Sequence, residues 1–283
     1  TQGGITGTLL HFTLPMLVGS FLQQCYNIAD TLIVGQCIGA GALAAVGSAY
    51  TLMVFLISVL LGLAMGSGTV FSLHYGAGNH VALRRSIFSS FVLIGIVTLI
   101  LNVAVFIWLD PILRLLQVPQ DIYGMMRSYL WIIFCGIVFT FIYNFYASLL
   151  RAVGDSVTPL WFLAVSVVLN IALDLFFILQ LDWGIQGAAA ATVLAQGVAA
   201  LGIIIYTYRR RPELRWHHED MCFDRTCLKE IASFSTLTCI QQSVMNLGIL
   251  MVQGLVNSFG TAVMAAFAAA VKIDLSLIHI SEP

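Results

Sequence analysis

The stretch Ser86–Leu109 reads SIFSSFVLIGIVTLILNVAVFIWL, 24 residues without a single Asp, Glu, Lys or Arg. Roughly 20 helical residues cross a bilayer core, so this stretch is long enough to span it. Helices satisfy their own backbone hydrogen bonds inside a membrane, and the stretch does not show the alternation of barrel strands. Similar charge-free runs occur at Ser128–Leu150, Ser156–Leu173, Trp183–Tyr208 and Ile231–Val271. The sequence therefore predicts an all-α integral membrane protein.

The overall composition agrees with this prediction. The 283 residues are 60% hydrophobic and 9% charged, whereas soluble domains carry about 25% charge. Between Thr1 and Leu83, Asp30 is the only charged residue. The net charge of −1 gives no electrostatic reason to expect nucleic-acid binding. We expect the lipid bilayer to be the main partner.

Seven membrane spans can be placed along the chain, with an eighth beginning near Gly260. They cover about 9–34, 46–73, 86–110, 124–150, 159–179, 184–208 and 231–256. Glycine, proline and asparagine mark the expected breaks between them. These breaks are Gly39-Ala-Gly41, Gly76-Ala-Gly78-Asn79, Asp110-Pro111, Val118-Pro119, Gly154-Asp155 and Asp182-Trp183-Gly184.

The basic residues predict an orientation. Nine of them fall on one side of the predicted spans and two, Arg114 and Arg127, on the other. The nine are Arg84, Arg85, Arg151, Arg209, Arg210, Arg211, Arg215, Arg225 and Lys229. Because cytoplasmic loops hold the excess of Lys and Arg, we expect a cytoplasmic N-terminus and a multi-pass protein of the inner or plasma membrane.

An internal repeat predicts two lobes. Gln23-Gln24 recurs as Gln241-Gln242, at an offset of 218 residues, so the seventh span restarts the first. Six spans then form an N-terminal lobe at 1–208, a cytoplasmic linker follows at 209–229, and 230–274 begins a second lobe, as in transporters built from parallel repeats. The last nine residues, 275–283, match the translation of a sequencing-library adapter, and we expect native sequence to end near Asp274.

Polar residues inside the spans are candidate functional groups, because an ionisable group there costs about 2.5–3.5 kcal/mol to insert. Asp30 and Asp174 are the two acids. Counting residues from the outer ends of the spans places both at one depth, in the outer half of the membrane, together with Asn170, Thr192 and Tyr129. Such oxygens could bind Na+ or share a proton. The alternative is that each group is only hydrogen-bonded near a helix end.

Further polar residues share faces with these acids and are candidates to line a substrate cavity. They are Gln23, Asn27 and Gln196, together with Gln241 and Gln242 of the repeat. His217, His218, Cys222 and Cys227 are of the residue types that bind zinc, but their spacing matches no standard zinc pattern. We expect a polar loop there. No cofactor and no metal other than a possible Na+ at Asp30, Asn170, Asp174 and Thr192 is expected.

Several motifs in combination resemble the multidrug and toxic compound extrusion (MATE) transporters, over residues 8–274. The resemblance rests on Leu14-Pro15, Gln24, Asn27-Ile-Ala-Asp30-Thr-Leu-Ile-Val-Gly35, Gly76-Ala-Gly78-Asn79, Leu150-Arg-Ala-Val-Gly154-Asp155 with Pro159, Asn170-Ile-Ala-Leu-Asp174, and Gly184-Ile-Gln-Gly187-Ala-Ala-Ala-Ala-Thr192. It implies twelve helices in two lobes and a monomer that exports drugs or amphipathic, often cationic, compounds in exchange for H+ or Na+.

The DinF-like branch of that family is the most similar. The resemblance implies that Asp30 is the coupling carboxylate, that Asn170, Asp174, Thr192 and Tyr129 form its network, and that Pro15 allows the first helix to bend. One departure concerns the seventh span. Another branch has a glutamate there, whereas Thr238-Cys-Ile-Gln-Gln-Ser243 has no acid.

Two other functions remain as alternatives. A lipid-linked oligosaccharide flippase of the same superfamily would need a more cationic cavity, and the spans lack Arg and Lys apart from Arg127, near the outer end of the fourth span, and Lys272. A membrane-embedded enzyme would need a compact catalytic set, and only His11 and His74 come close to the spans. Secondary active transport is therefore the favoured function.

Overall fold

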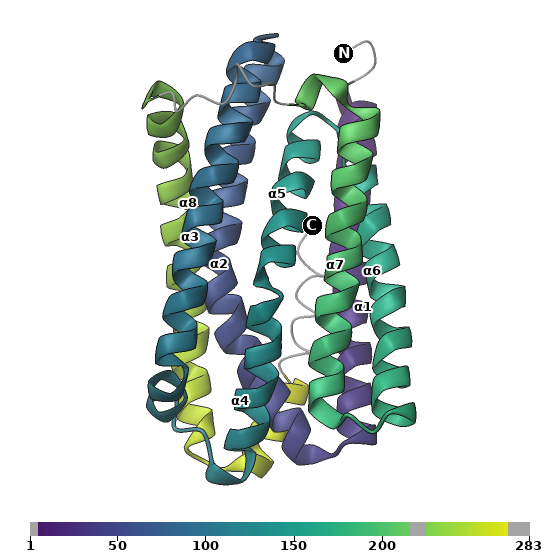
Figure 1. The fold of residues 1–283 in the computed structure, drawn as a ribbon, viewed down its shortest axis with the longest axis vertical. Helices are drawn as coiled ribbons and strands as arrows, with labels where there is room; N and C mark the ends of the chain where they lie inside the picture. The colour runs from purple at the N-terminus through teal and green to yellow at the C-terminus, as the bar shows by residue number, and fades with distance from the viewer. Residues whose placement is uncertain (1–4, 216–224, 271–283) are drawn as a thin grey trace.

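The computed structural model describes residues 5–215 and 225–270, and every regular element among them is helical (Figure 1). The main helices are α1 (Ile5–Cys37), α2 (Ala40–Gly76), α3 (His80–Leu115), α4 (Gln120–Cys135), α5 (Ile137–Ala152), α6 (Val157–Leu175), α7 (Gly184–Arg210) and α8 (Arg225–Asn257). Short turns of π-helix at Phe176–Gln180 and 3-10 helix at Pro212–Leu214 follow α6 and α7, and residues 261–270 are helical again. The predicted all-α class is confirmed.

Long apolar helices dominate the described residues. Five of them, α2, α3, α6 with its π turn, α7 and α8, are long and apolar enough to cross a membrane, and α4 with α5 can form a sixth span. α1 is not among these five although it has 33 residues. The polar residues Gln23, Asn27 and Asp30 lie in its second half.

The breaks between helices are shorter than predicted. α1 ends at Cys37 and α2 begins at Ala40, so the predicted break from 34 to 46 was too wide. Gly39 makes this tight turn possible with φ 115°, a value that residues with a Cβ rarely adopt. The predicted break at Asp110-Pro111 was wrong, because α3 continues through Pro111 to Leu115. The missing N–H of Pro111 removes one hydrogen bond only, close to the end of the helix.

The fourth predicted span is not one straight helix. α4 and α5 meet at Gly136 with a bend of 49°. α7 passes close to this bend, and a Cβ on Gly136 would lie 2.5 Å from Cγ2 of Val193. The prediction of a single helix at 124–150 therefore missed a break that glycine permits.

The helices form two groups joined by the bent pair. α1, α6 and α7 pack on one another, α2 packs with α3 and α8, and α4 and α5 contact both α2 and α7 (Figure 1). The loops after α2, α5 and α7 lie at one end of the bundle, and those after α1, α3 and α6 lie at the other. The first end holds Arg84, Arg85, Arg151 and the arginines from 209 to 215, as the charge count predicted.

α8 packs along α2 over most of its length. Close approach is possible because α2 carries Gly62 and Gly66, four residues apart, as in the small-residue motifs of membrane helices. A Cβ on Gly66 would lie 2.4 Å from the Cα of Ser235, and one on Gly62 would lie 2.5 Å from the Cα of Cys239. The backbones of α2 and α8 are therefore close together where these glycines lie.

Candidate functional site

Two buried carboxyl groups lie at the centre of the candidate site. Asp174 is on the last turn of α6 and is fully buried, and Asp30 on α1 is 9% exposed. Each carboxyl group lies close enough to act electrostatically on the other. A π-helical turn begins two residues after Asp174, at Phe176. The structure thus brings together the two acids that the sequence singled out from different spans.

Asn170 and Thr192 connect Asp174 to α7. In the orientation that satisfies both ends of its amide, Asn170 donates from nitrogen to Oδ2 of Asp174 (2.9 Å), and its oxygen lies 3.3 Å from Oγ1 of Thr192. The Thr192 hydroxyl also lies 3.1 Å from the carbonyl oxygen of Ala188 and 3.4 Å from the hydroxyl of Tyr26. The other carboxyl oxygen of Asp174, Oδ1, is buried without a hydrogen-bond partner among the described residues.

Tyrosines surround the acids. Tyr129 on α4 was predicted, and it is 6% exposed, within electrostatic range of both Asp30 and Asp174. Tyr26 and Tyr50 were missed: Tyr26 lies within electrostatic range of both acids, and Tyr50 hydrogen-bonds Asn27. Tyr26 precedes Asp30 by four residues and therefore shares its helix face, which is the signal that could have identified it.

A cavity of about 210 Å³ opens next to this network, between α1, α2, α5, α6 and α7. Polar and apolar side chains both line it. The polar ones are Gln23, Tyr26, Thr140, Tyr143, Asn144, Ser166, Asn170, Thr192 and Gln196. Gln196 accepts a hydrogen bond from Thr140. Of the predicted cavity residues, Gln23 and Gln196 therefore line this space, and Asn170 and Thr192 link it to Asp174.

The remaining predicted residues lie elsewhere. Asn27 is buried beside the cavity and donates to Gln24 (3.2 Å) rather than lining the space. Pro15 lines a second cavity nearer the arginine-rich end. Gln241 is exposed on α8 and Gln242 is half-buried there, and neither lines the cavity beside Asp174.

The histidine and cysteine cluster was a candidate for zinc. His217, His218 and Cys222 lie outside the described residues, as does the side chain of Cys227. Within 5–215 and 225–270, no group of three or more His, Cys, Asp or Glu side chains is arranged to hold a metal ion. The predicted adapter-derived tail, 275–283, also lies outside the described residues.

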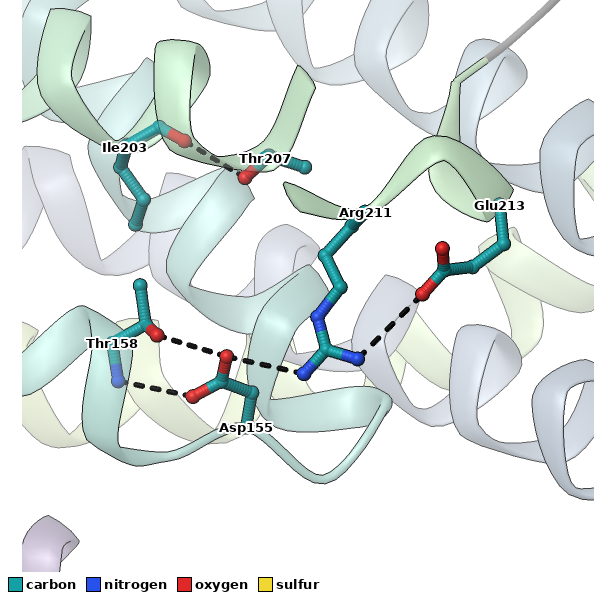
Figure 2. Close-up of polar contacts among 6 residues, drawn as sticks. All are labelled: Asp155, Thr158, Ile203, Thr207, Arg211 and Glu213. Atoms are coloured by element: carbon teal, nitrogen blue, oxygen red, sulfur yellow. Dashed lines mark hydrogen bonds and ion pairs between the residues drawn. The ribbon is translucent and has the colours of Figure 1, made fainter. Parts of the chain in front are cut away.

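A second polar cluster joins the α5–α6 turn to the end of α7 (Figure 2). Asp155 accepts hydrogen bonds from the backbone N–H (3.0 Å) and hydroxyl (2.8 Å) of Thr158, and its Oδ2 lies 3.3 Å from the guanidinium of Arg211. Arg211 also pairs with Glu213 at 3.6 Å. Partial burial by itself lowers the pKa of Arg211, but the hydrogen bond and charge of Asp155 raise it above its ordinary value. This cluster fixes the arginine-rich end of the bundle.

The fold is that of a multi-pass helical membrane protein with a buried polar network, and comparisons with known proteins give its family. The family model described as MatE matches residues 15–176. The chain therefore belongs to the MATE family of membrane transporters. It is 32% identical over 281 residues to the probable multidrug resistance protein YpnP of Bacillus subtilis, covering 97% of this chain and 61% of that protein. It is 30% identical over 263 residues to YoeA of the same organism, covering 90% of this chain and 57% of YoeA.

Solved structures share the fold. An inward-facing multidrug resistance MATE transporter of the MOP superfamily superposes with a TM-score of 0.83 at 25% identity, over 97% of this chain and 63% of that one. The MATE multidrug transporter DinF-BH, solved in complex with rhodamine 6G, gives a TM-score of 0.90 at 24% identity, over 98% of this chain and 62% of that one. The chain thus spans about three fifths of the length of these relatives.

Proposed function

We propose that this chain forms the ion-coupling lobe of a secondary antiporter, together with the first part of a second lobe. The transporter exports amphipathic, often cationic, organic compounds in exchange for H+ or Na+ entering from outside. The observation that carries this proposal is the pair of buried carboxyl groups, Asp30 and Asp174, placed beside a cavity by α1, α6 and α7. Membrane proteins rarely bury acids at this depth without a functional reason.

The mechanism follows from the charge of this pair. With both carboxylates ionised, the site attracts cations; a bound proton or Na+ neutralises part of that charge. Oδ1 of Asp174 accepts no hydrogen bond from the described residues, and the carboxyl group of Asp30 lies beside Asp174, so a proton or Na+ that enters between the two groups can bind there. Ion occupancy then lowers the affinity for a cationic substrate and favours a different lobe conformation. An ion can shift such an equilibrium only through its different affinity for the two states.

The names of the relatives support the substrate class. YpnP and YoeA are described as probable multidrug resistance proteins, and DinF-BH was solved with rhodamine 6G. No Arg or Lys is among the described residues that line the cavity beside Asp174, which favours a cationic or neutral group at that place. We place the protein in the plasma membrane as a monomer, with its arginine-rich end in the cytoplasm, and in the DinF-like branch of the family.

Asp30→Asn tests the coupling role. In vesicles carrying a full-length protein with this sequence, we expect the substitution to abolish efflux of rhodamine 6G driven by an H+ or Na+ gradient, because Asn cannot carry the charge. Asp110→Asn is the matched control, since the side chain of Asp110 is 44% exposed and pairs with Arg127 at 2.9 Å outside the network. It should keep efflux close to that of the parent. Undiminished gradient-driven efflux by Asp30→Asn would remove Asp30 from the mechanism.

A further inference from the structure

A second cavity, of about 310 Å³, lies between α1, α5 and the start of α6, toward the arginine-rich end. Arg151, on the last turn of α5, is the only charged residue that lines it within the described part of the chain. Its other lining residues include Ser20, Gln24 and Asn144. The cavity is therefore a polar space with one cation in its wall.

Arg151 makes no ion pair and no side-chain hydrogen bond with the described residues, in contrast to three other arginines. Arg127 pairs with Asp110, Arg211 pairs with Asp155 and Glu213, and Arg215 donates to a backbone carbonyl. Arg151 is half-buried, yet it makes neither an ion pair nor a hydrogen bond within residues 5–215 and 225–270. A half-buried guanidinium that faces a cavity and has no counter-charge is a binding group for an anion from outside the protein.

The two cavities are adjacent. Gln23, Tyr143, Asn144 and Leu163 line both of them. Along α6, the cavity with Arg151 begins at Pro159 and the other reaches Asn170, eleven residues further, or roughly 16 Å at 1.5 Å per residue. Met16, Leu160 and Leu163 give the second cavity an apolar wall. A long amphipathic molecule fits this combination of shape and polarity.

We propose that Arg151 binds the carboxylate or phosphate group of an amphiphile whose apolar body extends toward Leu163. Guanidinium groups recognise these anions by paired, charge-assisted hydrogen bonds, and the side chains of Ser20 and Gln24 can add donors. The anion belongs either to a soluble amphiphile or to the headgroup of an anionic phospholipid. This inference rests on the proposed function, because it gives the exporter's ligand a second charged end opposite the acidic network.

Octyl phosphate is the probe. It is titrated into the purified chain in phosphatidylcholine nanodiscs, with empty nanodiscs as the blank. Arg151→Gln should weaken binding by about tenfold or more, because the charge-assisted hydrogen bonds to the anion are lost, and Arg151→Lys should retain part of the affinity. Arg209→Gln is the matched control, since Arg209 is exposed at the same end of the bundle. It should bind as the parent does.

Gly19→Leu provides a test that leaves Arg151 intact. Its side chain would enter the cavity beside Leu160, which lies 3.6 Å from a Cβ on Gly19, and binding should be lost. If the melting temperature of Arg151→Gln shows that this variant does not fold, Gly19→Leu serves as the test in its place. Parent-like binding by either variant, or equal weakening by Arg209→Gln, would overturn the proposal.

The lipid content of the nanodiscs identifies the source of the anion. If the site takes a phospholipid, phosphatidylglycerol should compete with octyl phosphate in the parent chain. If the site takes a soluble amphiphile, the affinity should not change with lipid. Either result supports the site. The titration uses no ion gradient, so failure to bind octyl phosphate would leave the coupling role of Asp30 standing.

Discussion

Asp174 has surroundings that stability alone does not explain. Its side chain is fully buried, one oxygen accepts from Asn170, and the other has no partner among the described residues. An unsatisfied buried carboxyl oxygen costs free energy, and an aspartate within a membrane span adds to that cost. The binding of H+ or Na+ that we propose for this site accounts for both costs.

Thr192 is the residue that links this acid to the cavity, and its hydroxyl can be removed without changing its shape. We expect Thr192→Val to reduce gradient-driven efflux several-fold, because Asn170 and Tyr26 both lose a partner. The loss of stability should be small, about 0.6–1.7 kcal/mol, as for other hydrogen bonds between membrane helices. Thr192→Ser is the control and should transport like the parent. Equal efflux by the Val and Ser variants would show that the hydroxyl is not used.

At this scale the sequence was informative where depth could be counted. The span boundaries alone predict a common depth in the membrane for five polar residues, and the structure brings these residues together. They are Asp30, Asp174, Asn170, Thr192 and Tyr129. Tyr26 and Tyr50 were missed because a tyrosine in a span is not unusual in itself. The repeat suggested Gln241 and Gln242, but a repeat does not say which face of α8 meets the cavity.

Among the elements, α2 and α8 form the most complete polar contact. Asn257 on α8 donates to Ser48 (3.2 Å) and to the carbonyl of Leu116 (2.8 Å), and Gln253 accepts from Thr51 (3.2 Å). All four side chains are buried. These bonds hold the α8 end against α2 and the α3–α4 loop, at the end of the bundle opposite the arginines.

The bend between α4 and α5 offers a test of packing between elements. Gly136→Ala should reduce the free energy of unfolding by about 1–3 kcal/mol, as overpacking does in other cores, because the new methyl group would meet both γ carbons of Val193. Gly136 has a φ of −91°, which alanine also adopts, so the cost of the substitution is steric. Val193→Ala removes those γ carbons. In the Val193→Ala background, Gly136→Ala should reduce the free energy of unfolding by less. Melting temperatures of the parent, the two single variants and the double variant measure this difference. An unchanged cost would mean that α7 does not constrain the bend.

Helix existence was easier to predict than helix ends. Charge-free runs located the long apolar helices, because the bilayer sets a minimum length. Gly39 and Gly41 suggested a wide break, yet the chain turns within two residues, and Pro111 suggested an end that the helix passes through. The presence of Gly136 did not predict a bend, because single glycines also occur in straight membrane helices. Whether the helix breaks, bends or continues at each of these three positions depends on how neighbouring helices pack, which a single sequence does not show.

On the scale of the whole molecule, charge is distributed unevenly between the two ends of the helical bundle. Most basic residues lie at one end, the acidic network lies toward the other, and the two cavities occupy the space between them within α1, α5, α6 and α7. Membership of the MATE family follows from the match to residues 15–176. Exchange of an ion for a cationic substrate is the central claim, and it requires that the two compete through Asp30 and Asp174.

Competition can be measured directly on the purified chain by the fluorescence polarisation of rhodamine 6G. We expect binding of this dye to weaken by roughly tenfold, a typical coupling between two ligands, when either the pH is lowered or Na+ is raised. Dye binding weakens rather than strengthens because H+ or Na+ neutralises the carboxylates that attract the cationic dye. In Asp30→Asn the affinity for the dye should depend less steeply on pH and Na+ than in the parent, because only Asp174 remains to bind the ion. Affinity of the parent that is independent of both ions, or an identical dependence in Asp30→Asn, would contradict the account.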